Sequence, residues 1–287
     1  MLDTAALSAN GRPLEGVGEL RRSSAGDHHR LAEDGYLFVP SLLDRDEVAA
    51  AREELLFRQD ELTQDYPMRS ERMRAVLMGD RMLGFFAGLL GGAVRSYDFI
   101  WLRHQHPGAP ATLPHCDVVF MGRGTPDVLT CWTPFGDIAP GGGGLLILED
   151  SHRTSPQRLA GYLEQDVDSY CENGPNAEAV RQGDIRWEHW RHEPGLGWDG
   201  EISGDAVALG EQWGGRWLTA DYRMGDVLVF TMRTVHAGAD NHTDGIRLST
   251  DSRYQRADAP VDDRWIRGEH GEDPIGHGLA AKRGKIC

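Results

Sequence analysis

The sequence has few basic residues, few cysteines and no long hydrophobic run. Its 30 Lys and Arg residues stand against 45 Asp and Glu, and the resulting net charge of -15 disfavours nucleic acid and membrane as partners. The four cysteines lack the paired spacing of a zinc site, so we predict reduced thiols in a cytoplasmic protein. No run approaches the roughly 20 apolar residues of a membrane span, and the first residues lack the basic flank of a signal peptide.

The chain is long enough for one large domain, which we predict over residues 1–287. Its 36 glycines and short strand-like runs favour a mainly β architecture with flanking helices. Residues 1–30 are expected to form a loose N-terminal arm, residues 151–215 an insertion that serves as a lid or substrate-binding region, and residues 258–287 a charged tail without core character. The predicted helices are 43–57 and 82–90, and the predicted strands are 34–40, 94–103, 127–134, 145–148, 216–219, 226–230 and 246–254.

His115 and Asp117 are the strongest candidates for metal ligands. They lie two positions apart in the strand-like run 113–120, and side chains at i and i+2 of a strand share a face. A third ligand is expected from His236, at the end of an apolar strand-like run and just before a glycine. Two histidines and one carboxylate that leave coordination positions open are typical of non-haem Fe(II) oxygenases.

Arg247 and Ser249 lie eleven and thirteen residues after His236, again at i and i+2. A guanidinium there could bind a carboxylate bidentately, with a hydroxyl adding a hydrogen bond. This is the chemistry needed to anchor the far carboxylate of 2-oxoglutarate. The same ligand types are also compatible with two other functions, a non-catalytic binding protein and a zinc-dependent enzyme. A zinc enzyme, however, would give Arg247 and Ser249 no role.

Several segments, in order, resemble the phytanoyl-CoA dioxygenase family of Fe(II)/2-oxoglutarate oxygenases. They are the opening run 34–40 with its following helix, the His115-Cys-Asp117 motif, residues 130–137, residues 144–152, and the closing stretch with His236-Ala-Gly and Arg247-x-Ser249. Asp150 stands where the family signature usually has glycine. The resemblance spans residues 34–256 and covers the insertion poorly.

The resemblance implies a double-stranded β-helix, the cupin-like jelly roll, with Fe(II) on His115, Asp117 and His236. It further implies that Arg247 and Ser249 hold the C5 carboxylate of 2-oxoglutarate, with Trp132 and Thr130 beside this cosubstrate. The expected reaction uses O2, releases succinate and CO2, and hydroxylates a small-molecule substrate; desaturation, cyclisation and demethylation also occur in the family. Halogenation is disfavoured, because Asp117 fills the coordination position on the metal that a halide would need. No oligomeric state is predicted.

Overall fold

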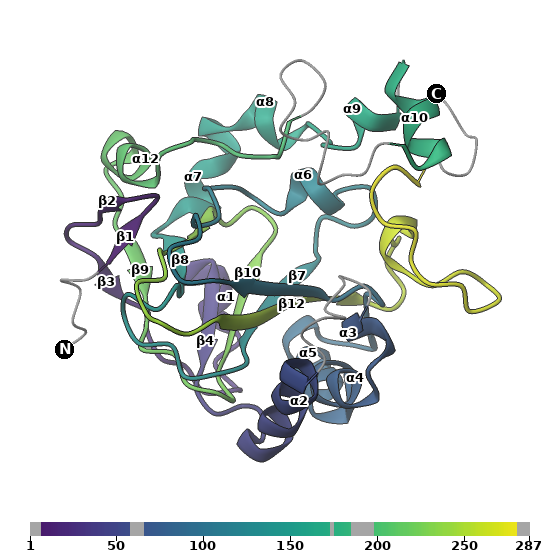
Figure 1. The fold of residues 1–287 in the computed structure, drawn as a ribbon, viewed down its shortest axis with the longest axis horizontal. Coiled ribbons are helices and arrows are strands. Elements are labelled where there is room, and N and C mark those ends of the chain that lie inside the picture. The colour runs from purple at the N-terminus through teal and green to yellow at the C-terminus, as the bar shows by residue number, and fades with distance from the viewer. Residues whose placement is uncertain (1–6, 58–65, 173–174, 185–197, 280–287) are drawn as a thin grey trace.

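The structure is a computed structural model that describes residues 7–57, 66–172, 175–184 and 198–279. Two β-sheets form its centre, with helices on the outside (Figure 1). The larger sheet has the strand order β4-β10-β7-β12-β5, and a further strand, β6, also pairs with β12. Its strands are β4 (Tyr36–Val39), β5 (Val94–Ser96), β6 (Trp101–Gln105), β7 (Leu129–Pro134), β10 (Val227–Thr231) and β12 (Arg247–Arg256).

The smaller sheet faces the larger one and has the order β11-β8-β9-β3. Its strands are β3 (Gly18–Glu19), β8 (Leu145–Leu148), β9 (Trp217–Thr219) and β11 (His236–Gly238). Phe38, Leu228 and Phe230 of the larger sheet pack against Ile147 and Leu218 of the smaller one. The predicted mainly β architecture with flanking helices is therefore confirmed.

Alternation along the central strands explains why both faces of the larger sheet are covered. Successive side chains of a strand point to opposite faces, so Leu228 and Phe230 face the smaller sheet while Val227 and Val229 face outward. The outward residues pack against a layer of helices that closes the lower side of the molecule in Figure 1. These helices are α2 (Arg45–Phe57), α3 (Tyr66–Arg69), α4 (Glu71–Met78) and α5 (Asp80–Leu90).

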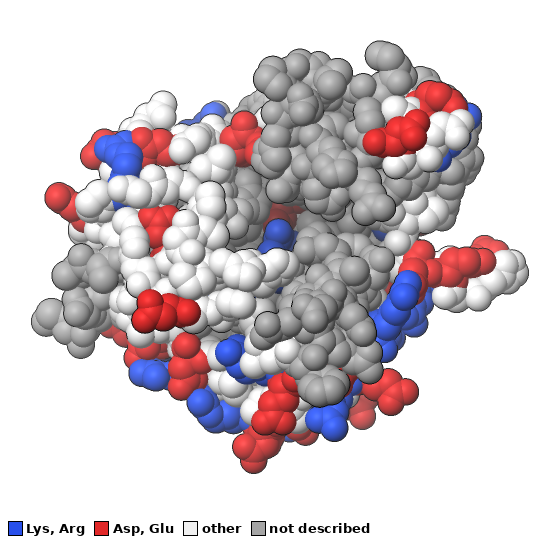
Figure 2. All heavy atoms as spheres, viewed as in Figure 1, with Lys and Arg blue, Asp and Glu red and all other residues white. Residues whose placement is uncertain are grey.

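The helices predicted at 43–57 and 82–90 are confirmed as α2 and α5. Gly91 ends α5 in the left-handed conformation, with φ of 68°, which costs glycine little. On the face shown in Figure 2, acidic and basic side chains alternate over this helical layer. Arg72 lies 3.6 Å from Glu54, and Arg81 lies 2.9 Å from Glu47. The exposed arginines of this layer are thus largely paired on the surface.

Residues 151–215 are more helical than their weak periodicity predicts. They contain α7 (Ser151–Arg158), α8 (Ala160–Leu163), α9 (Ser169–Glu172), α10 (Pro175–Gln182) and α12 (Ala206–Trp213). Ala206 and Leu209 of α12 pack against Leu146 and Trp217 of the smaller sheet. Tertiary packing on a small apolar face, rather than a long amphipathic repeat, therefore stabilises these helices. No helix in the described part of the chain is both long and apolar enough to span a membrane.

The two flanking segments differ from their predictions. Residues 7–30 are not a loose arm: they contain the hairpin β1 (Ser8–Ala9) and β2 (Arg12–Pro13), and Leu7, Leu14 and Leu20 are buried. The hydroxyl of Ser8 donates to Asp240 at 2.5 Å. The described part of the tail is also packed, since Trp265 is buried in the short 3-10 helix η2 (Asp263–Trp265). In both segments a few isolated apolar residues carry the packing, and such residues leave no periodic signal. Helix α1 (His29–Asp34) leads from the first segment into β4.

Candidate active site

His115 and His236 face each other across two short backbone hydrogen bonds. The amide of His115 donates to the carbonyl of His236 at 3.0 Å, and the amide of His236 donates back at 3.1 Å. His236 begins β11, separated from β10 by a turn, rather than ending the preceding strand as predicted. The two imidazole centroids lie 4.1 Å apart. The backbone pairing of His115 with His236, which are far apart in sequence, thus brings their two imidazole rings together.

Asp117 does not share a strand with His115, so the strand predicted over 113–120 is wrong. Asp117 has helical backbone angles, φ −66° and ψ −21°, and directly precedes the short helix α6 (Val118–Met121). Its carbonyl accepts from the amides of Phe120 and Met121. The apolar run that reads as a strand is therefore a turn followed by a helix. The carboxylate nevertheless reaches the two histidines.

The three side chains form the one cluster of potential metal ligands found among the described residues, with donor atoms within 4.8 Å of one another. Oδ1 of Asp117 lies 3.8 Å from Nε2 of His115 and 3.7 Å from Nε2 of His236. Two donors about 2.1 Å from one ion can be at most about 4.2 Å apart. A single transition-metal ion between these atoms is therefore compatible with their spacing.

Backbone carbonyls fix the imidazoles in the form that a metal requires. Nδ1 of His115 lies 2.8 Å from the carbonyl of Leu113, and Nδ1 of His236 lies 3.0 Å from that of Thr234. A carbonyl only accepts, so each Nδ1 carries a proton, and Nε2 is the ring nitrogen through which each imidazole can bind a metal. Burial and the neighbouring His236 lower the pKa of His115 to about 3, so its ring is neutral at neutral pH.

The other carboxylate oxygen of Asp117 is held by the protein. Nη2 of Arg253 donates to Oδ2 at 3.0 Å, and the hydroxyl of Thr130 donates to the same oxygen. Burial alone would raise the pKa of the Asp117 carboxyl, but Arg253, the two imidazoles and Thr130 outweigh it and hold this pKa well below its usual range. Asp117 is therefore an anion whose Oδ1 remains available.

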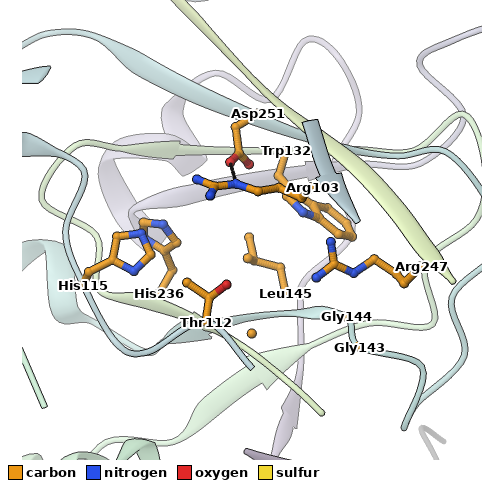
Figure 3. A pocket seen from close by; sticks show the side chains of 11 residues that line it. Arg103, Thr112, His115, Trp132, Gly143, Gly144, Leu145, His236, Arg247 and Asp251 are labelled. Carbon is orange, nitrogen blue, oxygen red and sulfur yellow. Dashed lines mark hydrogen bonds and ion pairs between the residues drawn. The ribbon is translucent and has the colours of Figure 1, made fainter. Parts of the chain in front are cut away.

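A pocket opens beside the two histidines and extends to Arg247 (Figure 3). Trp132 and Leu145 form part of its wall. Three lining positions are glycines, and a Cβ at Gly143 would come within 2.3 Å of Oε1 of Gln105. The absence of a side chain at Gly143 thus leaves room for Gln105, whose Oε1 accepts from Arg247. The lining consists of Arg103, Thr112, His115, Trp132, Gly143, Gly144, Leu145, His236, Gly238, Arg247 and Asp251.

Arg247 is a half-buried cation without a carboxylate partner among the described residues. Its Nη1 donates to Ser249 at 2.7 Å and its Nη2 to Gln105 at 3.0 Å, while its Nε has no partner. Burial lowers the pKa of Arg247 to about 10, which leaves it charged at neutral pH. A guanidinium held by neutral acceptors at the end of a pocket is suited to bind an anionic ligand.

The structure gives the remaining predicted residues different positions. Trp132 lines the pocket, whereas Thr130 and Ser249 are not among its lining residues and instead bond to Asp117 and Arg247. Two tryptophans of the segment predicted as a lid or substrate-binding region, Trp198 and Trp213, lie outside the lining, and positions 187 and 190 fall outside the described residues.

Sequence reasoning missed an ion pair inside the pocket. Nε of Arg103 on β6 donates to Asp251 on β12 at 2.8 Å, and the pair lies between the histidines and Trp132 in Figure 3. It also did not single out Arg253, which contacts Asp117. The signal was present, because residues 247, 249, 251 and 253 continue the i, i+2 pattern along one face of β12.

The model of the family described as phytanoyl-CoA dioxygenase matches residues 59–249, about two thirds of the chain. The chain belongs to the phytanoyl-CoA dioxygenase family. Its members use Fe(II), 2-oxoglutarate and O2, so the predicted family and cofactors are confirmed. No curated protein sequence matches the chain.

Solved structures of other oxygenases share the fold of this family member. The α-ketoglutarate-dependent epimerase SnoN of nogalamycin biosynthesis is 21% identical, with a TM-score of 0.55 over 88% of this chain and 92% of that one. The carbocyclase SnoK of the same biosynthesis is 18% identical, with a TM-score of 0.57 over 84% and 90%. EctD from S. alaskensis is 16% identical, with a TM-score of 0.57 over 95% and 93%. Identities this low show a common fold, which confirms the predicted jelly roll.

The residues present fit the cofactors of the family. The cluster offers two imidazole nitrogens and one carboxylate oxygen, a donor set suited to non-haem Fe(II) with open positions. Arg247 at the other end of the same pocket offers a cation to a dicarboxylate. The two histidines and the guanidinium of Arg247 therefore line one pocket that a metal-bound dianion could fill.

Proposed function

We propose that the chain is a dioxygenase that oxidises a C–H bond of a small-molecule substrate, with hydroxylation as its reaction and succinate and CO2 as coproducts. His115, Asp117 and His236 hold Fe(II) in this proposal, and Arg247 with Ser249 binds the C5 carboxylate of 2-oxoglutarate. The observation that carries it is the half-buried guanidinium of Arg247, which has no carboxylate partner among the described residues and lies in the pocket that the two histidines also line. A cation that is partly removed from water is stabilised by an accompanying anion.

The bound iron would supply the activation of O2 that is coupled to oxidative decarboxylation of 2-oxoglutarate. The side chains of this protein perform the remaining tasks. The two imidazoles offer Nε2 because their Nδ1 protons are engaged by carbonyls. Gln105 and Ser249 orient the guanidinium of Arg247 toward the pocket. Trp132, which is 2% exposed and packs edge-on against Tyr222, excludes water from the wall beside the cosubstrate.

We further infer that residues 151–215 form part of the substrate site. This segment contacts the part of the chain that carries His115 and Asp117, because the backbone of Glu201 pairs with that of His115. The hydroxyl of Tyr162 accepts from the amide of Cys116 at 2.9 Å and donates to the carbonyl of Gly200 at 2.6 Å. A substrate approaching the metal would therefore meet this segment. The buried free thiols of Cys116 and Cys131 support the proposal that the protein works in the cytoplasm.

The first test is an anaerobic titration of metal-free protein with Fe(II) and then with 2-oxoglutarate. A weak visible charge-transfer band is expected from the iron chelate in the wild type, and its loss is expected in His115→Ala. A screen of small molecules would then follow succinate formation, and incorporation of 18O from O2 into the product would identify hydroxylation.

Two results would overturn this proposal. Well-folded, iron-loaded protein that gives no band with 2-oxoglutarate would favour a metal-binding protein without catalysis. Activity that requires zinc and does not respond to 2-oxoglutarate would favour a zinc-dependent enzyme. An oxidised product without new oxygen would retain the cofactors but replace hydroxylation by desaturation or cyclisation.

A further inference from the structure

Arg253 and Thr130 contact Asp117 from two neighbouring strands. They are direct cross-strand partners, with Arg253 on β12 opposite Thr130 on β7. Both donate to the same atom, Oδ2 of Asp117, from Nη2 and the hydroxyl respectively. Oδ1 points instead toward Nε2 of both histidines, at 3.8 and 3.7 Å. The two oxygens of one carboxylate thus have separate partners.

We propose that Arg253, together with Thr130, is a positioning residue that holds Asp117 as a one-oxygen metal ligand. This inference rests on the proposed metal site. The two donors occupy Oδ2, so only Oδ1 remains for an ion between the histidines. In a six-coordinate ion, two imidazoles and one carboxylate oxygen leave three positions open. A dicarboxylate that chelates through two atoms and one O2 molecule need three.

The alternative geometry would block the reaction. A carboxylate that binds through both oxygens leaves two open positions, and chelation by 2-oxoglutarate would fill both. An aspartate without such contacts can rotate between binding through one oxygen and binding through two. The charge-assisted hydrogen bond from Arg253 and the hydroxyl hydrogen bond from Thr130, both to Oδ2, disfavour this rotation. Arg253 therefore controls how many positions the metal presents.

The surroundings of Arg253 do not account for its burial in another way. The side chain is 1% exposed, and its Nε and Nη1 have no hydrogen-bond partner. Its guanidinium lies over the ring of Trp101, 4.4 Å from the centroid. Asp117 is its one ionic partner among the described residues. A buried pair of this kind contributes little to stability compared with apolar packing, so the contact with Asp117 is the feature that the burial serves.

The same strand face also carries the cosubstrate anchor. Arg247, Ser249 and Arg253 occupy positions i, i+2 and i+6 of β12, and β12 pairs with both β6 and β7 over most of its length. One rigid strand therefore fixes the spacing between the carboxylate ligand and the guanidinium at the far end of the pocket.

The test measures metal binding without turnover. Metal-free wild type, Arg253→Met, Thr130→Val and the control Arg256→Ala would be titrated anaerobically with Co(II), and the visible bands of bound Co(II) would report affinity and coordination. Arg256 lies on the same strand but forms an exposed ion pair with Asp258. We expect Arg253→Met to weaken Co(II) binding by about 10–100-fold, Thr130→Val to weaken it less, and Arg256→Ala to leave it unchanged. Arg253→Met should also alter the band shape.

A double-mutant cycle decides whether Arg253 acts through Asp117. In an Asp117→Ala background, Arg253→Met should cause no further loss of Co(II) affinity. An equal loss in both backgrounds would overturn the proposal, as would wild-type affinity and spectra in Arg253→Met. If Arg253→Met does not fold, wild-type binding by Thr130→Val overturns it. Wild type that binds no Co(II), or unchanged binding in His115→Ala, would instead disprove the metal site itself.

Discussion

Asp117 and Asp168 are both buried carboxylates beside arginine, yet their hydrogen bonding differs. Oδ1 of Asp168 lies 2.6 Å from Nδ1 of His277, and its Oδ2 accepts from Arg264 at 2.8 Å and from the amide of Gly278 at 3.1 Å. In Asp117 the protein engages Oδ2 alone, while Oδ1 faces two imidazole nitrogens beyond hydrogen-bond distance. Both oxygens of Asp168 thus accept hydrogen bonds from the protein, whereas only one oxygen of Asp117 does.

The arginines of the two regions differ in the same sense. Arg264 is fully buried and donates to Asp262, Asp166 and Asp168, so its charge is neutralised within the protein. Arg247 is half-buried and is held by neutral acceptors. The paired charges around Arg264 hold the C-terminal segment to the rest of the fold. Two charged groups of opposite sign, Oδ1 of Asp117 and the guanidinium of Arg247, are instead left available at the two ends of the pocket. The difference separates a structural ion network from a binding site.

The largest effect should come from Asp117→Ala. Removal of the one anionic donor is expected to weaken Fe(II) binding by about 10³-fold or more and to abolish turnover, because a charged ligand is replaced by open space. Asp168→Asn should leave Fe(II) affinity within about threefold of wild type, since the hydrogen bonds of Asp168 are to Arg264, His277 and Gly278 and not to the proposed metal ligands. Anaerobic metal titration of both variants measures this difference. Equal losses in the two variants would remove the distinction drawn between the carboxylates.

Arg247→Ala should have the next largest effect on ligand binding. Loss of charge-assisted hydrogen bonds worth about 1.5–3 kcal/mol is expected to raise the Kd for 2-oxoglutarate by about 10–150-fold, with Fe(II) binding unchanged. Arg247→Lys should fall between Ala and wild type because it keeps the charge without the planar fork. Titration of iron-loaded protein with 2-oxoglutarate gives the Kd, and Arg256→Ala is the matched control. Wild-type affinity in Arg247→Ala would place the cosubstrate elsewhere.

The sequence predicted the residues at both ends of the pocket better than the local structure around them. Arg247 and Ser249 lie on a regular strand, where the i, i+2 rule holds, and continuing that rule would have added Asp251 and Arg253. The rule failed at Asp117, because a short apolar run reads equally as strand or helix. The pairing of His115 with His236 joins residues far apart in the chain, and no local pattern encodes it.

The fold was predicted where apolar residues repeat and was missed where they do not. The central strands β4 and β10 are short apolar runs buried on both faces, and helices α2 and α5 have apolar residues at helical spacing. In the tail, Arg264 and Asp262 are fully or almost fully buried. A run rich in charge reads as solvent-exposed unless its partners are known, and the partners of Arg264 include Asp166 and Asp168, almost a hundred residues earlier.

Asp168→Asn should reduce stability rather than binding. Replacing the carboxylate leaves Arg264 with less compensation in a fully buried position, and breaking such a pair costs about 3–5 kcal/mol. The free energy of unfolding from urea denaturation, read together with Fe(II) affinity, measures both properties. The exposed-pair variant Arg256→Ala should change stability by less than about 1 kcal/mol. A stable Asp168→Asn protein that fails to bind iron would reverse the roles of the two carboxylates.

The smallest effect concerns pH. Burial would raise the pKa of Asp168, but His277 and Arg264 outweigh it and hold this pKa below its unfolded value of about 3.9. A depressed folded pKa means that the unfolded state binds more protons, so the contribution of Asp168 is complete above about pH 5 and is lost as the pH falls below about 4. The Asp168→Asn variant lacks this carboxylate, so its stability does not contain this pH-dependent contribution. The stability gap between wild type and Asp168→Asn should therefore narrow below about pH 4, by at most about 1.4 kcal/mol per pH unit for one proton. Urea unfolding of both proteins between pH 3 and pH 7 measures the gap, and a gap independent of pH would show that Asp168 acts through packing instead of charge.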